Sequence, residues 1–562
     1  MLSLSQHLVG RYASGFTQGG NTIMRWLLLI APLALAACAA PSTPAVPTDD
    51  GQPKSGGSMS VRITNDPHDF DLSYNGKSRP MNDMQSQVNA SLIGFKSAPD
   101  VDFNTLILRP ELAERWDISP DARTFTFHLH KGLKFANLPP ANGRELTSAD
   151  VKWSLEYYSR SGEFKDKKLV PGAFEYFFEG LEAIETPTPQ TAVVRFKDPF
   201  VPFINYAASD FNAIVAKEIY EQDSHHKDRV AGAGPFYLDL GASQKGTRWS
   251  LKKNPNYVEP GKPYIDEVRW LVIPEEATAI AAYQSKQLDY LGDFDLNRQT
   301  VEDLKKSSPS SVFYEYLFPG GSHVYMNVTR PPLDKLEVRK ALILAIDREE
   351  LSRTAYGKVL PGTPPGAFVG LFNEAEGRQL TRHDLNEAKR LLTQAGYPNG
   401  LDLQWEFSRA DPDEIVSALQ LMQAQLKKAG INVTFKVLEQ AEWAGNRRTK
   451  DYTINLLTST CGGQQEDQEI PLYGCYYSKN RANYGGVNDP ELDKFLIAQR
   501  QETDLEKRRE LQRQAVRRVG EMAWAFDLHY RPEWEAWHPH LKNFAPNAGN
   551  RGPNFVDSWL EK

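Results

Sequence analysis

Residues 111–135 read ELAERWDISPDARTFTFHLHKGLKF and residues 145–156 read ELTSADVKWSLE, and these two stretches decide the fold. Phe125, Phe127 and Leu129 alternate with polar residues, which is the period of a half-buried strand. Thr147 is followed three residues later by Asp150, a helix-capping pattern that precedes an apolar helical face. The pattern alone predicts a β-hairpin and a helix of an α/β domain.

This order of elements closely resembles the signature of the family 5 extracellular solute-binding proteins, the peptide-, nickel- and oligosaccharide-binding receptors of bacterial ABC importers. The resemblance covers nearly everything from Gly57 to the end, with further matching segments at 232–236, 254–257, 261–266, 327–334 and 338–348. It implies an α/β, two-lobed periplasmic-binding-protein fold with an extra inserted domain and a hinge between the lobes. It also implies a small polar ligand, ABC permease subunits as partners, a monomer and no cofactor.

The resemblance divides the chain into seven segments. In order, they are a lipoprotein signal peptide (1–38), a flexible tether (39–57), the first part of lobe I (58–100), an inserted domain II (101–224), the second part of lobe I (225–318), lobe III across the ligand cleft (319–530) and the C-terminal part of lobe I (531–562).

Composition indicates a soluble globular protein: 562 residues, of which 40% are hydrophobic and 24% charged, enough for two to four domains. The formal net charge of −7 argues against a nucleic-acid partner. We find no zinc, dinucleotide or Gly-x-Ser-x-Gly motif, and we interpret His225-His226 as a solvated loop rather than a metal site. A binding protein is therefore favoured, with a hydrolase whose carboxylates lie among the 72 acidic residues as the alternative.

The N-terminal segment carries targeting information. An apolar run from Trp26 to Ala37 follows Arg25 and is shorter than the roughly 20 residues of a membrane span, so it indicates a secretory signal. Leu35-Ala36-Ala37-Cys38 resembles a lipobox, which implies that Cys38 is acylated and anchors a periplasmic lipoprotein to the membrane. The alternative is a plain signal peptide with a coincidental cysteine, and translation starts at Met1 or Met24.

Residues 384–457 predict a β-α-β-α-β unit. Helical faces at 384–395 and 411–429 alternate with strands at 401–407, 431–437 and 452–457. Parallel strands of such a unit end at one edge of the sheet, and ligands bind beyond that edge. Candidate ligand residues are Arg409 after the first strand, Trp443 on the short helix, and Thr458, Ser459, Thr460, Gly462 and Gly463 after the third strand.

The loop after residue 457 also borders the ligand cleft of the family. Peptide-binding members usually carry there an acidic residue, in a Trp-x-Ala-Asp-Tyr-like segment, that pairs with the ligand's amino terminus. This chain departs from that segment, and Glu466 or Asp467 could substitute, with solvated loop charges as the alternative. The departure raises an oligosaccharide or an opine-like sugar conjugate as alternatives to an oligopeptide. Asn483 and Tyr484 match a further family loop and complete the candidate ligand site.

Cys461 and Cys475 are the two cysteines that remain once Cys38 is acylated. In an oxidising compartment they are a candidate disulfide, and two unpaired thiols are the alternative. A bridge would fix the polar loop between them beside the cleft.

Overall fold

The computed structural model describes residues 51–561, except for 68–69, 73–78, 168, 170–174, 293–295, 319–321, 358–369, 412, 458–466, 529–530 and 550–552. The predicted signal peptide with Cys38 lies outside the described residues, as do the loop at 458–466 and its Cys461. Across the described ranges, no helix combines the length and the apolar character that a membrane crossing requires.

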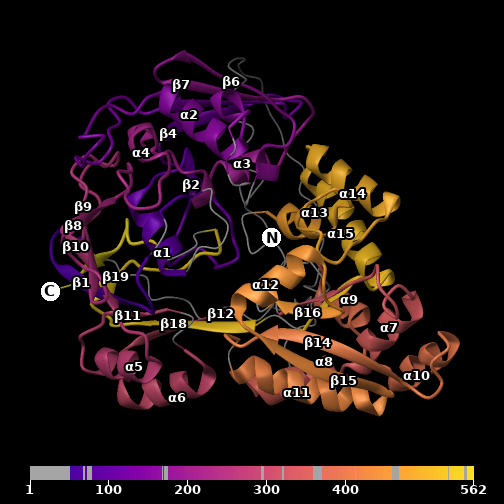
Figure 1. The fold of residues 1–562 in the computed structure, drawn as a ribbon. Helices are drawn as coiled ribbons and strands as arrows, with labels where there is room; N and C mark the ends of the chain where they lie inside the picture. The colour runs from indigo at the N-terminus through magenta and orange to yellow at the C-terminus, as the bar shows by residue number, and fades with distance from the viewer. Residues whose placement is uncertain are drawn as a thin grey trace, which may run out of the picture. The chain divides into compact units, whose positions relative to one another are not determined.

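Region I is built on a seven-stranded mixed sheet with the strand order β12-β18-β11-β1-β10-β9-β8 (Figure 1). The strands are β1 (Ser58–Ile63), β8 (Phe236–Gln244), β9 (Arg248–Lys253), β10 (Glu267–Val272), β11 (Tyr290–Leu291), β12 (Val312–Phe318) and β18 (Arg531–Trp537). The helices in the same stretches are α1 (Arg79–Val88), α5 (Glu276–Gln284) and α6 (Arg298–Ser307). The sheet therefore draws its strands from three separate stretches of the chain, while the domain boundaries given above stay a prediction.

Region II is built on a four-stranded antiparallel sheet with the order β4-β5-β7-β6. Its elements are β4 (Ala113–Ile118), β5 (Thr124–Leu129), β6 (Leu181–Thr188), β7 (Thr191–Phe196), α2 (Ser148–Ser159), α3 (Phe203–Tyr206), α4 (Lys217–Asp223) and the short 3-10 helix η2 (Glu175–Phe178). The predicted strand at 124–129 is confirmed: Phe125, Phe127 and Leu129 are buried. The capping box of Thr147 and Asp150 at the start of α2 is confirmed as well.

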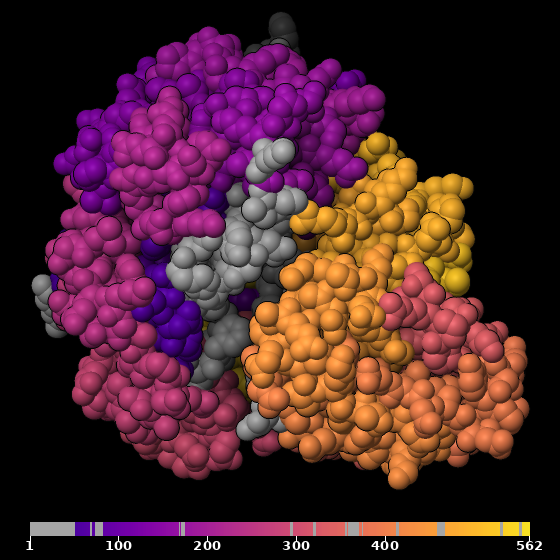
Figure 2. Space-filling model, in the orientation of Figure 1, coloured from indigo at the N-terminus to yellow at the C-terminus, as the bar shows by residue number. Residues whose placement is uncertain are grey.

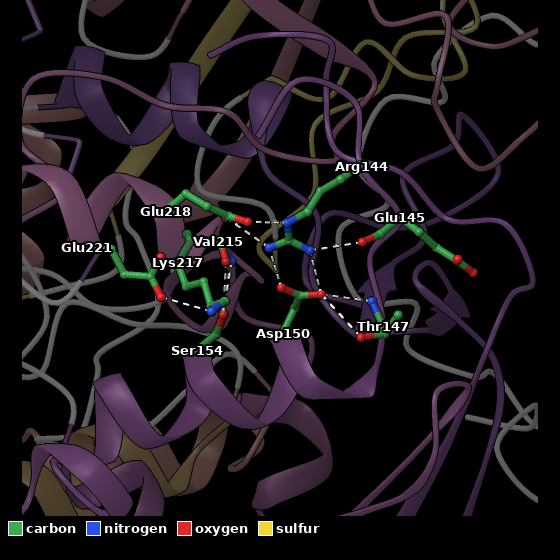
Figure 3. Close-up of polar contacts among 9 residues, drawn as sticks. All are labelled: Arg144, Glu145, Thr147, Asp150, Ser154, Val215, Lys217, Glu218 and Glu221. Atoms are coloured by element: carbon green, nitrogen blue, oxygen red, sulfur yellow. Dashed lines mark hydrogen bonds and ion pairs between the residues drawn. The ribbon is translucent and has the colours of Figure 1, made fainter. Parts of the chain in front are cut away.

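Arg144 holds the start of α2 against α4 in region II, as Figure 3 shows. Its guanidinium donates to both carboxylate oxygens of Asp150, at 2.6 and 3.0 Å, and to both oxygens of Glu218 on α4. Asp150 also accepts the backbone N–H of Thr147 at 2.9 Å, so the helix cap and the ion pair share one carboxylate.

Region III is built on a five-stranded sheet with the order β15-β14-β16-β13-β17. Its strands are β13 (His323–Met326), β14 (Leu401–Ser408), β15 (Ile431–Leu438), β16 (Ile454–Leu457) and β17 (Ala525–Asp527). Its helices are α7 (Leu336–Ala345), α8 (Arg348–Tyr356), α9 (Glu374–Leu380), α10 (Leu385–Gln394), α11 (Asp413–Lys428), α12 (Gln440–Thr449), α13 (Glu469–Tyr476), α14 (Pro490–Gln501) and α15 (Leu505–Glu521). β14 pairs in parallel with β15 and β16, so the predicted β-α-β-α-β unit is confirmed.

The two faces of the region III sheet differ in chemistry. Trp405, Phe407 and Phe526 belong to an apolar core that α7, α10 and α11 complete. Strand alternation places Glu406, Asn455 and Asp527 on the opposite face, where they are buried polar side chains. Asp527 on this polar face lies at the edge of the sheet where the parallel strands end.

His226 corrects one interpretation made from the sequence. The residue is 3% exposed, and its ring packs edge to face on Trp153 and Tyr157, with ring centroids 5.8 and 5.7 Å away. Burial lowers the pKa of His226 to about 4. The interpretation as a solvated loop is wrong for this histidine, because its ring fills an aromatic cluster of region II. Among the described residues no cluster of three or more His, Cys, Asp or Glu could hold a metal ion.

Candidate functional site

The candidate site is the edge of region III at which strands β14, β15 and β16 end. Because β13 runs antiparallel to both β16 and β17, β17 also ends at this edge and β13 begins there. His323, the first residue of β13, lies opposite both Leu457 of β16 and Asp527 of β17. The strand ends therefore bring a histidine and a carboxylate to the place where ligands bind in sheets of this kind.

Arg409 and Trp443 flank this edge in different environments. The Arg409 side chain is exposed and pairs with Glu439 at 2.7 Å. Trp443 is 4% exposed, and its indole N–H donates to the carbonyl of Leu456 at 3.0 Å. The indole is thus part of the support beneath the sheet edge, and whether a ligand contacts it stays a prediction.

Arg447, also on α12, lies in an aromatic cluster that the sequence analysis missed. Its guanidinium carbon is 4.3 Å from the centroid of the Trp443 ring, 5.4 Å from that of Tyr484 and 5.9 Å from that of Tyr325. Contacts of this kind attract a cation to the faces of the rings. The predicted site residues Trp443 and Tyr484 therefore meet around an arginine that was not predicted.

His323 and Asp527 form a buried pair beside this cluster. The His323 Nδ1 and an Asp527 carboxylate oxygen are 2.5 Å apart, and both side chains are at most 5% exposed. Arg348 donates to the backbone carbonyl of Asp527 at 3.1 Å, and burial lowers the pKa of Arg348 to about 10. Burial, and then the Asp527 charge, raises the pKa of the Tyr476 hydroxyl, whose ring centroid lies 6.2 Å from that of His323.

Four side chains near the candidate edge carry buried polar atoms with no hydrogen-bond partner within the described part of the chain. The atoms are Nε2 of His323, Nε and Nη1 of Arg447, both side-chain amide atoms of Asn455, and the hydroxyl of Tyr476. Tyr325 connects them, since it faces Asn455 across the β13–β16 pair and its ring lies 4.5 Å from His323. We call these four side chains the polar cluster. Leaving such atoms unpaired costs about 1–3 kcal/mol each, so the polar cluster is suited to a polar guest.

Two other predicted site residues already have protein partners. Asp467 is 4% exposed, and Arg508 donates to both of its carboxylate oxygens, at 2.6 and 3.1 Å. Asn483 donates to the Val487 carbonyl at 2.7 Å and accepts its N–H at 3.0 Å, which closes a loop. Ligand contacts by either residue stay a prediction, and so do those of Thr458, Ser459, Thr460, Gly462, Gly463 and Glu466, which lie outside the described residues.

Cys475 of α13 is disulfide-bonded, with a partner outside the described residues. The predicted pairing with Cys461 remains a prediction. The bond attaches α13 covalently to another part of the chain, which limits the freedom of this helix next to the candidate site.

A surface hollow of about 240 Å³ lies at the start of α8 in region III and is lined by Asp347, Arg348, Glu349, Arg378, Thr381, Arg382 and His383. Two of its charged side chains, Glu349 and Arg378, pair with each other. Helix α8, which forms one wall, packs through Leu351 on the apolar core face of the sheet. The polar cluster is the better candidate because it lies at the strand ends.

One feature of the sequence could have pointed to some of the residues that the sequence analysis missed: these are polar residues in buried strands. Asn455 interrupts an otherwise apolar strand, while His323 is the first residue of β13 and Asp527 the last residue of β17. A polar residue in a buried strand requires a partner or a function. Nothing in the sequence shows that these three positions lie on one face of neighbouring strands.

Comparison with known proteins places these features in a family. The family model described as "Bacterial extracellular solute-binding proteins, family 5 Middle" matches residues 108–483, more than half of the chain. A dipeptide-binding protein of Escherichia coli K12 is 26% identical over 465 residues, which cover 77% of this chain and 83% of that protein. The glutathione-binding protein GsiB of the same strain is 24% identical over 402 residues, covering 69% and 74%.

A solved structure shows the same fold. The periplasmic binding protein DppA from Helicobacter pylori, in complex with the peptide STSA, matches with a TM-score of 0.73 and 24% identity over 91% of this chain and 99% of that chain. The predicted two-lobed α/β fold is thereby confirmed. The matched proteins are binding proteins and not enzymes. The chain therefore belongs to family 5 of the bacterial extracellular solute-binding proteins.

Proposed function

We propose that this chain is the substrate-binding receptor of an ABC importer and captures a short peptide or a related small polar solute. Two relatives, over most of their length, are named for a dipeptide and for glutathione, which are both short peptides. In this proposal the two lobes close about a hinge, and the solute stabilises the closed state by its contacts with both lobes. The receptor then delivers the solute to the permease subunits.

The polar cluster is the observation that carries the proposal. Arg447 has no ion-pair partner in the described ranges, and its buried Nε and Nη1 can donate to a carboxylate. Asn455 can both donate to and accept from a peptide group, and Tyr476 supplies a hydroxyl. An anionic group joined to amide groups is the chemistry that such a set recognises, and a short peptide carries both.

Small molecules that co-purify with the protein provide the direct test. Mass spectrometry of the released solutes is expected to find short peptides, and calorimetry with the same compounds should return the affinity. Oligosaccharides or opine-like sugar conjugates as the only tight ligands would replace the peptide assignment. Conversion of the solutes during incubation would instead support the hydrolase alternative, because a receptor returns them unchanged.

Trp443 provides a test of the site itself. Trp443→Ala removes a ring that supports Arg447 and donates to Leu456, so we expect a loss of about 1–3 kcal/mol in binding free energy. Calorimetry with the co-purified solute measures this, and circular dichroism checks that the variant is folded. Unchanged affinity in a folded variant would remove the α12 face from the site.

We also propose that the lipid on Cys38 anchors the mature protein to a membrane. The support is the Leu35-Ala36-Ala37-Cys38 sequence after an apolar segment. Cys38→Ser should release the protein into the soluble periplasmic fraction. A variant that remains with the membrane as firmly as the natural protein would contradict lipidation at this residue.

A further inference from the structure

Arg500 of α14 makes contacts that cross from region III to region II. Its Nη1 lies 2.6 Å from a carboxylate oxygen of Glu179, and its Nη2 donates to the carbonyl of Tyr176 at 3.0 Å. The guanidinium carbon also lies 4.4 Å from the centroid of the Phe200 ring. All three partners belong to region II, and we call this set the Arg500 contact. Figure 2 shows the gold surface of this part of region III against the purple surface of region II.

Region III supplies the support that holds Arg500 in place. The Tyr473 ring lies 3.8 Å from the guanidinium carbon, and the Tyr473 hydroxyl donates to Glu179 at 2.5 Å. The Nε of Arg500 lies 2.9 Å from a carboxylate oxygen of Glu469. Arg500 is 8% exposed and Glu469 is fully buried, so the pair is withdrawn from water in this arrangement of the two regions. The guanidinium therefore presents one of its edges to region II in a fixed orientation.

Three more interactions join the same surfaces. The backbone N–H of Val201 in region II donates to the backbone carbonyl of Arg500 at 2.8 Å. Asn205 of α3 donates at 2.8 Å to the Asp467 carboxylate, which also accepts from Arg508. Ile470 of α13 is packed in the apolar core of region II. An arginine, a backbone hydrogen bond and an apolar side chain therefore act together at one surface.

We propose that the Arg500 contact is the closing contact of this receptor: α13 and α14 of region III bind the inserted region II when the lobes are closed and separate from it when they open. The inference deepens the proposed function and rests on it for the link to solute release. Region II holds no part of the polar cluster, and in this scheme it acts by stabilising the closed state. Glu179 and Tyr473 are positioning residues in this scheme, because they act through the position of Arg500.

The Val201 amide reports on this contact directly, since its acceptor lies in region III. Hydrogen exchange of this amide requires the two regions to separate. The Phe196 amide is a matched internal reference, because it donates at 2.8 Å to the Arg123 carbonyl within region II. The ratio of the two exchange rates measures opening without any solute, so the result is independent of whether the peptide assignment holds.

Glu179→Gln removes the carboxylate that faces Arg500 and leaves the Arg500–Glu469 pair intact. The expected result is an increase of about five-fold in Val201 exchange, the size of one partly exposed charge-assisted hydrogen bond, with no change at Phe196. Tyr473→Phe should act in the same direction and less strongly. Glu185→Gln is the control, because Glu185 forms a two-point ion pair with Arg195 inside region II and its side chain is 50% exposed, against 49% for Glu179.

Two results would overturn the proposal. One is an unchanged Val201 rate in Glu179→Gln. The other is an equal increase at Val201 and Phe196, or in the Glu185→Gln control, which would show general loosening of region II. A selective increase at Val201 in both Glu179→Gln and Tyr473→Phe would support it.

Discussion

Arg144 and Arg500 each bind two carboxylates, yet they join different parts of the molecule. Arg144 holds Asp150 and Glu218, which both belong to region II (Figure 3). Arg500 holds Glu469 of its own region and Glu179 of region II. The first set of contacts can break only if region II loses structure, whereas part of the second can break while both regions stay folded.

One carboxylate from each set, Glu218 of the Arg144 contacts and Glu469 of the Arg500 contacts, differs from the other in the direction of its pKa shift. Burial, the largest single effect, raises the pKa of Glu218, but the hydrogen bonds from Arg144 and the backbone, together with the charges of Arg144 and Lys217, outweigh it and lower the pKa. Burial dominates at Glu469 and raises its pKa to about 7, although Arg500 and Arg508 act in the opposite direction. Glu469 can therefore take up a proton near neutral pH, and Glu218 cannot.

Arg144→Ala should give the largest effect on stability. It leaves the buried Asp150 carboxylate without its cation, so we expect a loss of about 4 kcal/mol in the free energy of unfolding. Urea denaturation followed by circular dichroism measures the loss. Arg195→Ala is the matched control, because that ion pair with Glu185 is exposed to solvent and its loss should cost far less. Equal losses in the two variants would show that the Arg144 contact has no special weight.

Reduction of the Cys475 disulfide should give the second-largest loss in the free energy of unfolding. Pairing with Cys461 closes a loop of about 15 residues, which contributes roughly 3 kcal/mol in the chain-entropy model. Reduction should therefore lower the free energy of unfolding by that amount, and it should also raise Val201 exchange, because α13 carries both Cys475 and Glu469.

Thiol titration of the denatured, unreduced protein tests the pairing itself. No free thiol before reduction and two afterwards, in protein whose Cys38 is acylated, is the expected count. One or two free thiols before reduction would contradict the pairing with Cys461.

The sequence predicted local structure well because the signals are local. Alternation in β5, the Thr147–Asp150 cap and the β-α-β-α-β unit each depend on residues within a few positions of one another. The family resemblance supplied the two-lobed arrangement, which no periodicity in the chain contains. The region III edge followed from strand order, and it directed attention to the α12 face, whose contact with a ligand stays a prediction.

Contacts between distant residues could not be predicted in this way. Glu179 and Arg500 are 321 positions apart, and a single sequence gives no sign that they meet. Arg508 resembles the other charged residues of α15 in sequence, yet it is buried because Asp467 needs a cation. Charge in a helix predicts exposure on average, and a buried partner on another element reverses that prediction.

His226 should make the stability of region II, rather than the closing contact, sensitive to acid. Its pKa is lowered to about 4 by burial, so the folded state keeps it neutral. The neutral form contributes its full stability above the unfolded pKa of about 6.5. This contribution is lost progressively as the pH falls from about 6.5 through the folded pKa of about 4. At pH 5 we expect a loss of about 2 kcal/mol in unfolding free energy from this group.

The variant His226→Phe should reduce this acid sensitivity, because phenylalanine keeps the aromatic packing and does not titrate. Unfolding by urea between pH 7 and pH 5 measures the difference between the two proteins. Parallel pH profiles would show that other groups control the acid response. Asp71, Asp223 and His225 are the titratable neighbours whose charges act on His226.

Glu469 gives the smallest expected effect, and it acts on opening rather than on unfolding. Its pKa is raised to about 7 in the closed arrangement, and opening exposes the surface of α13 that packs on region II through Ile470. The open state should therefore hold the proton less tightly, so closure is strongest at low pH and weakens as pH rises from about 4.5 through 7. The charged groups that act on Glu469 are Arg500, Arg508 and Glu179.

The ratio of Val201 to Phe196 exchange cancels the intrinsic pH dependence of both amides, so it isolates this coupling. We expect the ratio to rise by about three-fold between pH 6 and pH 7, less than the ten-fold limit for one full proton, because Arg500 pairs with Glu469 in both states. Glu469→Gln, which cannot ionise, should keep the ratio constant over this range. A ratio that changes equally in both proteins would assign the pH dependence to another group and leave Glu469 as a structural partner of Arg500.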